Sequence, residues 1–137
     1  MDHATFIGQV QARARLDSRG AAEGATRATL ETLAERVPAT VANDVAGQLP
    51  REIGEHLRRV AAAPDQPATG VRLRYPEFLD RVARRAHEDP ARAADEARCV
   101  MEVVGEATQG GVMEKIRHSV DRELGDFLLS GSTGRRA

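Results

Sequence analysis

The stretch FIGQVQARARLDSRGAA (residues 6–22) returns with changes as FLDRVARRAHEDPARAA (residues 78–94). The two stretches align without a gap at an offset of 72 residues. The identical pairs are Phe6 with Phe78, Val10 with Val82, Arg13 with Arg85, Ala14 with Ala86, Asp17 with Asp89, Ala21 with Ala93 and Ala22 with Ala94. Internal repetition defines the structural unit of a chain, so the fold is read one repeat at a time.

The similarity continues after a one-residue slip, which we place beyond Ala22. At an offset of 71, the residues Arg27, Glu31, Glu35, Val41, Arg51, Glu52, Gly54 and Leu57 match Arg98, Glu102, Glu106, Val112, Arg122, Glu123, Gly125 and Leu128. The sequence therefore predicts two tandem repeats, at residues 1–62 and 75–129. Because residues 63–74 contain Pro64, Pro67 and Gly70, we expect a linker there. The small, polar residues 130–137 predict a disordered tail.

Each repeat has the pattern of four helices. Phe6, Val10 and Ala14 recur every four residues, which is helical spacing and not strand alternation. Later segments carry apolar stripes of the same kind, namely Leu30, Leu33 and Val37, then Val41, Val45 and Leu49, then Ile53 and Leu57. The second repeat has apolar residues at matching places. These stripes predict an all-α protein.

Capping residues predict where the helices begin. Asp89 followed by Pro90 is typical of a helix start, because the carboxylate accepts from free N–H groups and proline needs none. We expect Asp17 to cap the matching helix of the first repeat, and Thr40 to cap the third helix. The breaks between later helices are expected at Pro38 and Pro50 and, in the second repeat, at Gly110–Gly111 and Asp121.

The composition indicates how the repeats must pack. Apolar residues make up 41% of the 137-residue chain but aromatic residues only 3%, so the core must be aliphatic. A unit of about fifty residues buries too little surface to be stable alone. Two copies that share their apolar faces avoid this problem. We therefore predict two four-helix repeats packed as one pseudo-two-fold helical domain.

The residues also resemble a known family. The run ATRATLETLAERV at residues 25–37, the QLPREI turn at Gln48–Ile53 and the Gly110–Gly111 break are similar to the bacterial family called domain of unknown function 2267. The resemblance covers nearly the whole chain apart from the linker and the tail. It implies an all-helical, cytoplasmic bacterial protein with a tandem repeat, and it implies no catalytic or binding residue. The second repeat departs from the pattern at residues 119–121, where Ser-Val-Asp replaces Gln-Leu-Pro.

Several features favour the cytoplasm. Cys99 is the only cysteine, so no intrachain disulfide forms, which is consistent with a reducing compartment. The N-terminus begins MDHATF and lacks the basic and apolar regions of a secretory signal. No stretch approaches the eighteen apolar residues of a membrane span. We expect Cys99 to be an inert, buried or half-buried thiol.

The sequence contains no recognisable catalytic constellation. It has no G-x-S-x-G, no P-loop and no dinucleotide-binding motif. Two Glu–His pairs, Glu52–His56 and Glu114–His118, have the i, i+4 spacing that could hold a metal. The pairs do not occupy equivalent positions in the two repeats, so we interpret them as surface pairs. We assign no catalytic, cofactor-binding or metal-binding residue and no cofactor.

Two functions remain open. The first is a non-enzymatic interaction or scaffold module that binds an unknown protein partner, or itself as a homodimer. Such a module should display an exposed apolar patch or a groove. The alternative is a nucleic-acid-binding protein that uses clustered arginines, with contacts at Arg13, Arg15, Arg19, Arg81, Arg84 and Arg85. A net charge of -1, an acidic second repeat and the scarcity of aromatics weigh against nucleic acid.

Overall fold

The computed structural model describes residues 1–131, and over this range the protein is all-helical. The eight helices of the described residues are α1 (His3–Ala14), α2 (Arg19–Arg36), α3 (Ala39–Gln48), α4 (Arg51–Ala61), α5 (Tyr75–Ala86), α6 (Pro90–Ala107), α7 (Val112–His118) and α8 (Arg122–Leu128). The expectation of four helices in each half of the chain is confirmed. Of the predicted tail, residues 130–137, the structure describes Ser130 and Gly131. The prediction for residues 132–137 lies outside the described residues.

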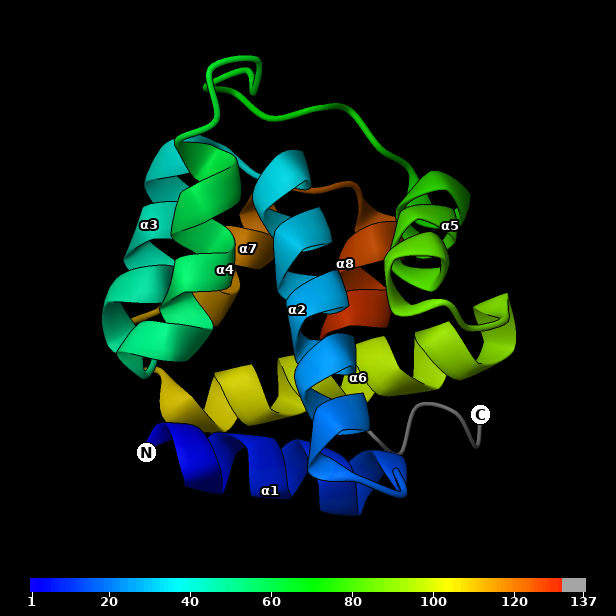
Figure 1. The fold of residues 1–137 in the computed structure, drawn as a ribbon. Helices are drawn as coiled ribbons and strands as arrows, with labels where there is room; N and C mark the ends of the chain where they lie inside the picture. Colours follow the sequence, from blue (N-terminus) through cyan, green and yellow to red (C-terminus); the bar gives the residue numbers. More distant parts are fainter. Residues whose placement is uncertain (132–137) are drawn as a thin grey trace.

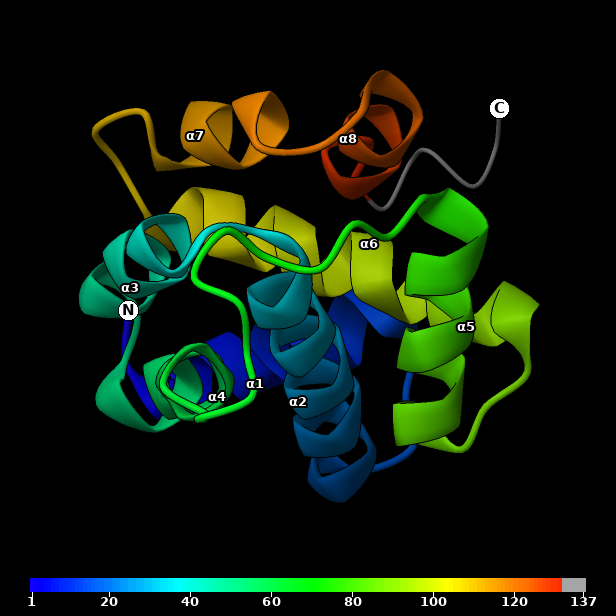
Figure 2. The same cartoon turned by 90° about the horizontal axis from the view of Figure 1, so that it is seen from above.

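The two longest helices, α2 and α6, lie at the centre of the molecule (Figure 1). Helix α1 packs along α6, and α5 packs against α2. Helices α3 and α4 cover one side of α2, while α7 and α8 lie beyond α6 when the molecule is viewed from above (Figure 2). Most residues of the core are aliphatic or small. The sequence-predicted apolar positions Phe6, Val10, Leu30 and Leu33 have no exposed surface.

The packing partners are compatible with the predicted pseudo-two-fold arrangement. If the repeats are related by a two-fold axis, α1 corresponds to α5 and α2 to α6. The contact of α1 with α6 is then equivalent to the contact of α5 with α2, and both contacts are present. The contacts of α2 with α6 and of α3 with α7 each map onto themselves. Under this correspondence, α1 and α5 each pack against both long helices, α2 and α6.

The predicted cap of α2 is wrong by one residue. Ser18, not Asp17, is the N-cap, and its hydroxyl accepts from the backbone N–H of Ala21 at 3.0 Å. In the second repeat Asp89 caps α6 as expected. The preceding helices end at equivalent left-handed residues, Arg15 and His87. The one-residue slip therefore lies in the α1–α2 loop, which is one residue longer than the α5–α6 loop, and not beyond Ala22.

The start of α3 is also earlier than predicted. Thr40 lies inside the helix, whose N-cap position is Pro38 and carries no side-chain cap bond. The other breaks occur where the sequence placed them. Pro50 is the N-cap of α4, Gly111 precedes α7 with a left-handed φ of 78°, and Asp121 caps α8.

The segment between α4 and α5 is not helical, but it is fastened to the first repeat. Its path arches over the top of the molecule in Figure 1. The backbone N–H of Val71 donates to Glu35 at 2.7 Å, and that of Ala39 donates to Ala68 at 2.9 Å. Leu73 is buried, and Arg36 donates to its carbonyl at 3.0 Å. This segment therefore has a fixed course over the end of α2.

Cysteine and phenylalanine side chains are among the buried residues. Cys99 is fully buried in α6, as expected. The three phenylalanines, Phe6, Phe78 and Phe127, are all buried as well, so they belong to the core. Within residues 1–131, no helix is both long enough and apolar enough to cross a bilayer.

Candidate functional site: the groove between helices α2 and α5

Two adjoining hollows lie between α2 and α5. The first is lined by Glu35, Arg81, Arg84 and Arg85. The second begins at Arg85 and continues to Glu96 on α6. Because Arg85 lines both, we treat them as one groove, the α2–α5 groove. It lies where the first helix of the second repeat rests on the long helix of the first.

Arg85 fastens α5 to α2 at the middle of this groove. Its Nη1 donates to Glu35 Oε1 at 2.6 Å and to Thr32 Oγ1 at 2.8 Å. Its Nε lies 3.3 Å from Glu31 Oε1. The two carboxylates are only 13% and 17% exposed, so the guanidinium compensates charges that would otherwise be poorly solvated.

A matching set of ion pairs joins α1 to α6. Arg13 lies 2.9 Å from Glu102 Oε1 and 2.6 Å from Glu106 Oε1. The hydrogen bond from Arg13 lowers the pKa of Glu106 below its ordinary value. Arg13 corresponds to Arg85 in the repeat alignment, and Glu102 and Glu106 correspond to Glu31 and Glu35. We call these two sets the reciprocal clamps. Residues common to both repeats thus hold the repeats together.

The six arginines considered for nucleic-acid contact do not form one surface of free charge. Arg13 and Arg85 belong to the reciprocal clamps. Arg81 pairs with Glu35 at 3.0 Å, and Arg84 pairs with Asp80 one turn away on α5. The remaining two are exposed near the α1–α2 turn: Arg15 is the left-handed C-cap of α1, and Arg19 begins α2.

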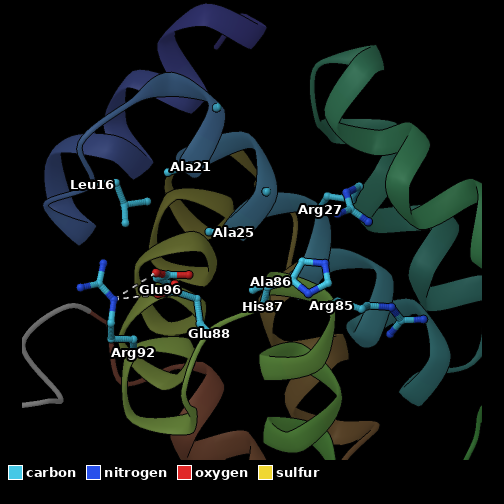
Figure 3. A pocket seen from close by; sticks show the side chains of 12 residues that line it. Leu16, Ala21, Ala25, Arg27, Arg85, Ala86, His87, Glu88, Arg92 and Glu96 are labelled. Atoms are coloured by element: carbon cyan, nitrogen blue, oxygen red, sulfur yellow. Dashed lines mark hydrogen bonds and ion pairs between the residues drawn. The ribbon is translucent and has the colours of Figure 1, made fainter.

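The second hollow is a cavity of about 220 Å³ at the junction of α2, α5 and α6 (Figure 3). Much of its wall is made of small or aliphatic residues, namely Leu16, Gly20, Ala21, Gly24, Ala25 and Ala86. Its polar lining residues are Arg27, Arg85, His87, Glu88, Arg92 and Glu96. A Cβ atom at Gly24 would meet nothing within 4 Å, so this part of α2 faces open space.

Glu96 is the unusual residue of this cavity, because it is a carboxyl group that is only 5% exposed. Its nearest cation is Arg92, whose Nε lies 4.0 Å from Glu96 Oε2. The same Nε is 2.7 Å from Glu88 Oε2. Burial, followed by the hydrogen bond and charge of Glu88, raises the pKa of Glu96 to about 7. A proton on this group is therefore exchanged near neutral pH.

Sequence reasoning did not single out Glu96. Glu88, Arg92 and Glu96 have i, i+4 spacing, which is typical of solvated helix faces. Glu96 could have been found by comparing the two repeats, provided that the one-residue shift in their alignment is placed in the α1–α2 loop. Glu96 then corresponds to Ala25, a buried alanine of α2. A buried acid has replaced a core alanine at an equivalent position.

Two of the four histidines, His56 and His3, have charged side chains as neighbours. His56 Nδ1 lies 3.2 Å from Arg59 Nη2, and burial together with Arg59 lowers its pKa. His3 pairs with Glu23 at 2.7 Å. Over residues 1–131, no group of three or more histidine, cysteine or acidic side chains is arranged to hold a metal ion.

Comparison with known protein families gives a match over most of the chain. The model of a family described as "Uncharacterized conserved protein (DUF2267)" matches residues 3–127, which include all of α1 to α7 and most of α8. A search of curated proteins finds no match to the chain.

Proposed function

The chain belongs to the DUF2267 family, and from the way its repeats enclose a groove we propose that it is a non-enzymatic module that binds a partner protein in the α2–α5 groove. The observation that carries the proposal is the fixed arrangement of charged side chains along this groove. The proposal places the protein in the cytoplasm of a bacterium, in keeping with its single, buried cysteine.

Ion pairs hold the groove side chains in position before any partner arrives. Arg81 and Arg85 share Glu35, and Arg59 on α4 lies 2.6 Å from Glu31. Ordered side chains lose less entropy on binding than mobile ones, so a pre-organised charged surface favours a specific partner. Arginine is also enriched at protein interfaces.

The surface proposed for binding is polar. Met1 is the one large hydrophobic residue that is exposed among residues 1–131, so the apolar patch that an interaction module could display is absent from that range. The groove is the second kind of surface that such a module could use. Recognition there would rest on charge and shape, which favours specificity and association rate.

Nucleic-acid binding is the alternative function. It is favoured by Arg15 and Arg19, which are exposed near the same turn and for which the described residues supply no ion-pair partner. Against it, Arg13, Arg81, Arg84 and Arg85 already have carboxylate partners. Paired arginines contribute less to the release of phosphate counterions, on which such affinity depends.

A site-specific crosslink tests the proposal. A photoreactive phenylalanine analogue would replace Arg84, which is 73% exposed beside the groove. The matched control would replace Glu123, an exposed residue of α8. After irradiation in lysate of the native cell, we expect one protein to crosslink at position 84 and not at 123, whether or not nuclease is added. A crosslink that disappears with nuclease would support the alternative, and a crosslink to a second copy would identify a homodimer.

A further inference from the structure

We propose that the cavity beside Glu96 is a binding site for an organic cation, a guanidinium or primary ammonium group carried on a short aliphatic stem. The site lies at one end of the α2–α5 groove. The cation can come from a side chain of a bound partner protein or from a free amine. Only the first source rests on the proposed function. The argument uses the charges around the cavity, its shape and the comparison of the two repeats.

The charges around the cavity leave the carboxyl group of Glu96 with one distant, shared cation, Arg92, whose Nε is 4.0 Å away and lies closer to Glu88. Arg85 is held by Glu31 and Glu35, and Arg27 lies 3.5 Å from Glu31. Arg92 sits closer to Glu88 than to Glu96, at 2.7 Å against 4.0 Å. Glu96 therefore faces the cavity with a second carboxyl, that of Glu88, as its neighbour. A buried carboxylate is costly unless a cation accompanies it, so the part of the cavity next to Glu96 suits a positive charge.

The walls of the cavity suit an aliphatic stem. Ala21, Ala25 and Ala86 present small apolar surfaces, and Leu16 closes one side (Figure 3). The volume of about 220 Å³ is smaller than that of pockets that enclose whole drug-sized ligands, which run from about 300 to 1,000 Å³. One small cationic group with a few methylenes matches both the size and the apolar lining.

The repeat comparison shows that the fold does not need an acid at this position. The equivalent residue in α2 is Ala25, which is 2% exposed and packs in the core. An alanine therefore satisfies the shared framework. A buried acid with a strongly shifted pKa in a cavity is a mark of a functional site.

Proton release follows from this arrangement. The charged and titratable groups around Glu96 lie on four elements and one loop. They are Arg27 on α2, Arg85 and His87 at the end of α5, Glu88 and Asp89 in the loop before α6, Arg92 and Asp95 on α6, and Arg15 at the end of α1. A bound cation favours the ionised form of Glu96. With a pKa of about 7, this group is ionised in about one molecule in ten at pH 6 and nine in ten at pH 8. Affinity should therefore rise about tenfold between these pH values.

Isothermal titration calorimetry of the full chain tests the site. The first probe is agmatine, a small molecule with a guanidinium group and a primary amine. The second is N-acetyl-arginine-methylamide, which mimics an arginine side chain of a partner protein. We expect at least one probe to bind about tenfold more tightly at pH 8 than at pH 6, with proton release at pH 6. Glu96→Gln should weaken binding at least tenfold. Glu114→Gln, a change at an exposed glutamate on α7, should leave it unchanged.

The two probes separate the sources of the cation. Binding of the capped arginine indicates a partner side chain, and binding of agmatine alone indicates a small free amine. No binding by either, equal binding by the Glu96→Gln variant, or affinity that does not change with pH would each overturn the proposal. The crosslink at position 84 is read independently, so a partner can be captured in the groove even if the cavity binds no cation. Thermal unfolding of Glu96→Gln verifies that the variant is folded.

Discussion

Gly54 and Gly125 occupy equivalent positions in α4 and α8, but a side chain would meet different surroundings at each. A Cβ at Gly54 would lie 2.7 Å from the carbonyl oxygen of Ala46, where α3 and α4 are closest. A Cβ at Gly125 would first meet a methyl group of Val120 at 3.4 Å. Glycine at position 54 therefore allows the backbones of α3 and α4 to come close together, whereas Gly125 in α8 is not needed for such a contact.

We expect Gly54→Ala to lower the free energy of unfolding by about 2 kcal/mol, because the helix backbones must separate. Gly125→Ala should leave it unchanged or raise it by about 0.5 kcal/mol, since alanine favours helix. Urea denaturation of both variants measures the two values. Equal losses at the two positions would show that the close contact of α3 with α4 is not the reason for the glycine.

Glu96 should make the stability of the protein depend on pH. Its folded pKa of about 7 lies above the value of 4.5 expected without the fold, so the folded state binds more protons between these pH values. Stability is therefore fully present below pH 4.5 and decreases as the pH rises through 7. At about 1.4 kcal/mol per pKa unit, the loss amounts to at most about 3 kcal/mol.

Glu96→Gln should remove this loss, so the variant should be the more stable protein at pH 8 and differ little at pH 4.5. Urea denaturation at both pH values checks the prediction. Glu114→Gln serves as the exposed control. Parallel pH profiles for Glu96→Gln and the wild type would mean that Glu96 is not the group that titrates. Greater stability without Glu96 would agree with a residue retained for binding and not for folding.

At the scale of the helix, the start of α2 tests which residue caps it. Ser18 accepts from the N–H of Ala21, whereas Asp17 is exposed. We expect Ser18→Ala to cost about 1 kcal/mol of stability and Asp17→Ala less than about 0.5 kcal/mol. Asp89→Ala, at the cap of α6, should resemble Ser18→Ala. Thermal unfolding of the three variants shows whether Ser18 or Asp17 caps α2. A larger loss of stability in Asp17→Ala than in Ser18→Ala would mean that Asp17 is the cap, as the sequence predicted.

The sequence could predict the helices but not the register of the loop between the first two. Apolar spacing and prolines predicted the helices and most of the breaks between them, because these signals are local. Asp17 and Ser18 are both good capping residues, so composition does not choose between them. Ala22 matches an alanine at either offset, Ala93 at 71 and Ala94 at 72. Only the position of α2 relative to α1 identifies the cap, and that position is set by tertiary packing.

At the scale of the molecule, the site could not be predicted because its parts come from different repeats. Arg27 with Glu31 and Arg98 with Glu102 have the i, i+4 spacing of surface pairs, which is typical of solvated helix faces. In the folded chain Glu31 keeps Arg27 at 3.5 Å but also meets Arg85 from α5, and Glu102 meets Arg13 from α1. Helical periodicity describes one helix at a time, so it contains no information about a partner fifty or more residues away.

The reciprocal clamps should make unequal contributions to stability. Arg85 lies between carboxylates that are 13% and 17% exposed, whereas those facing Arg13 are 27% and 53% exposed. Ion pairs contribute more where water screens them less. We therefore expect Arg85→Met to cost about 2 kcal/mol of unfolding free energy and Arg13→Met about 1 kcal/mol or less. Urea denaturation at low salt measures both losses, and 1 M NaCl should reduce the second more than the first.

Combining the substitutions shows whether the clamps act independently. They share no residue, so the Arg13→Met, Arg85→Met double variant should lose about the sum of the single losses. In contrast, Arg85→Met and Glu35→Gln remove the same ion pair, so their combination should cost less than the sum. Because the repeats share one core, each variant should still unfold in a single transition. Two separate transitions in the double variant would mean that the clamps, and not the shared core, make the repeats fold as one unit.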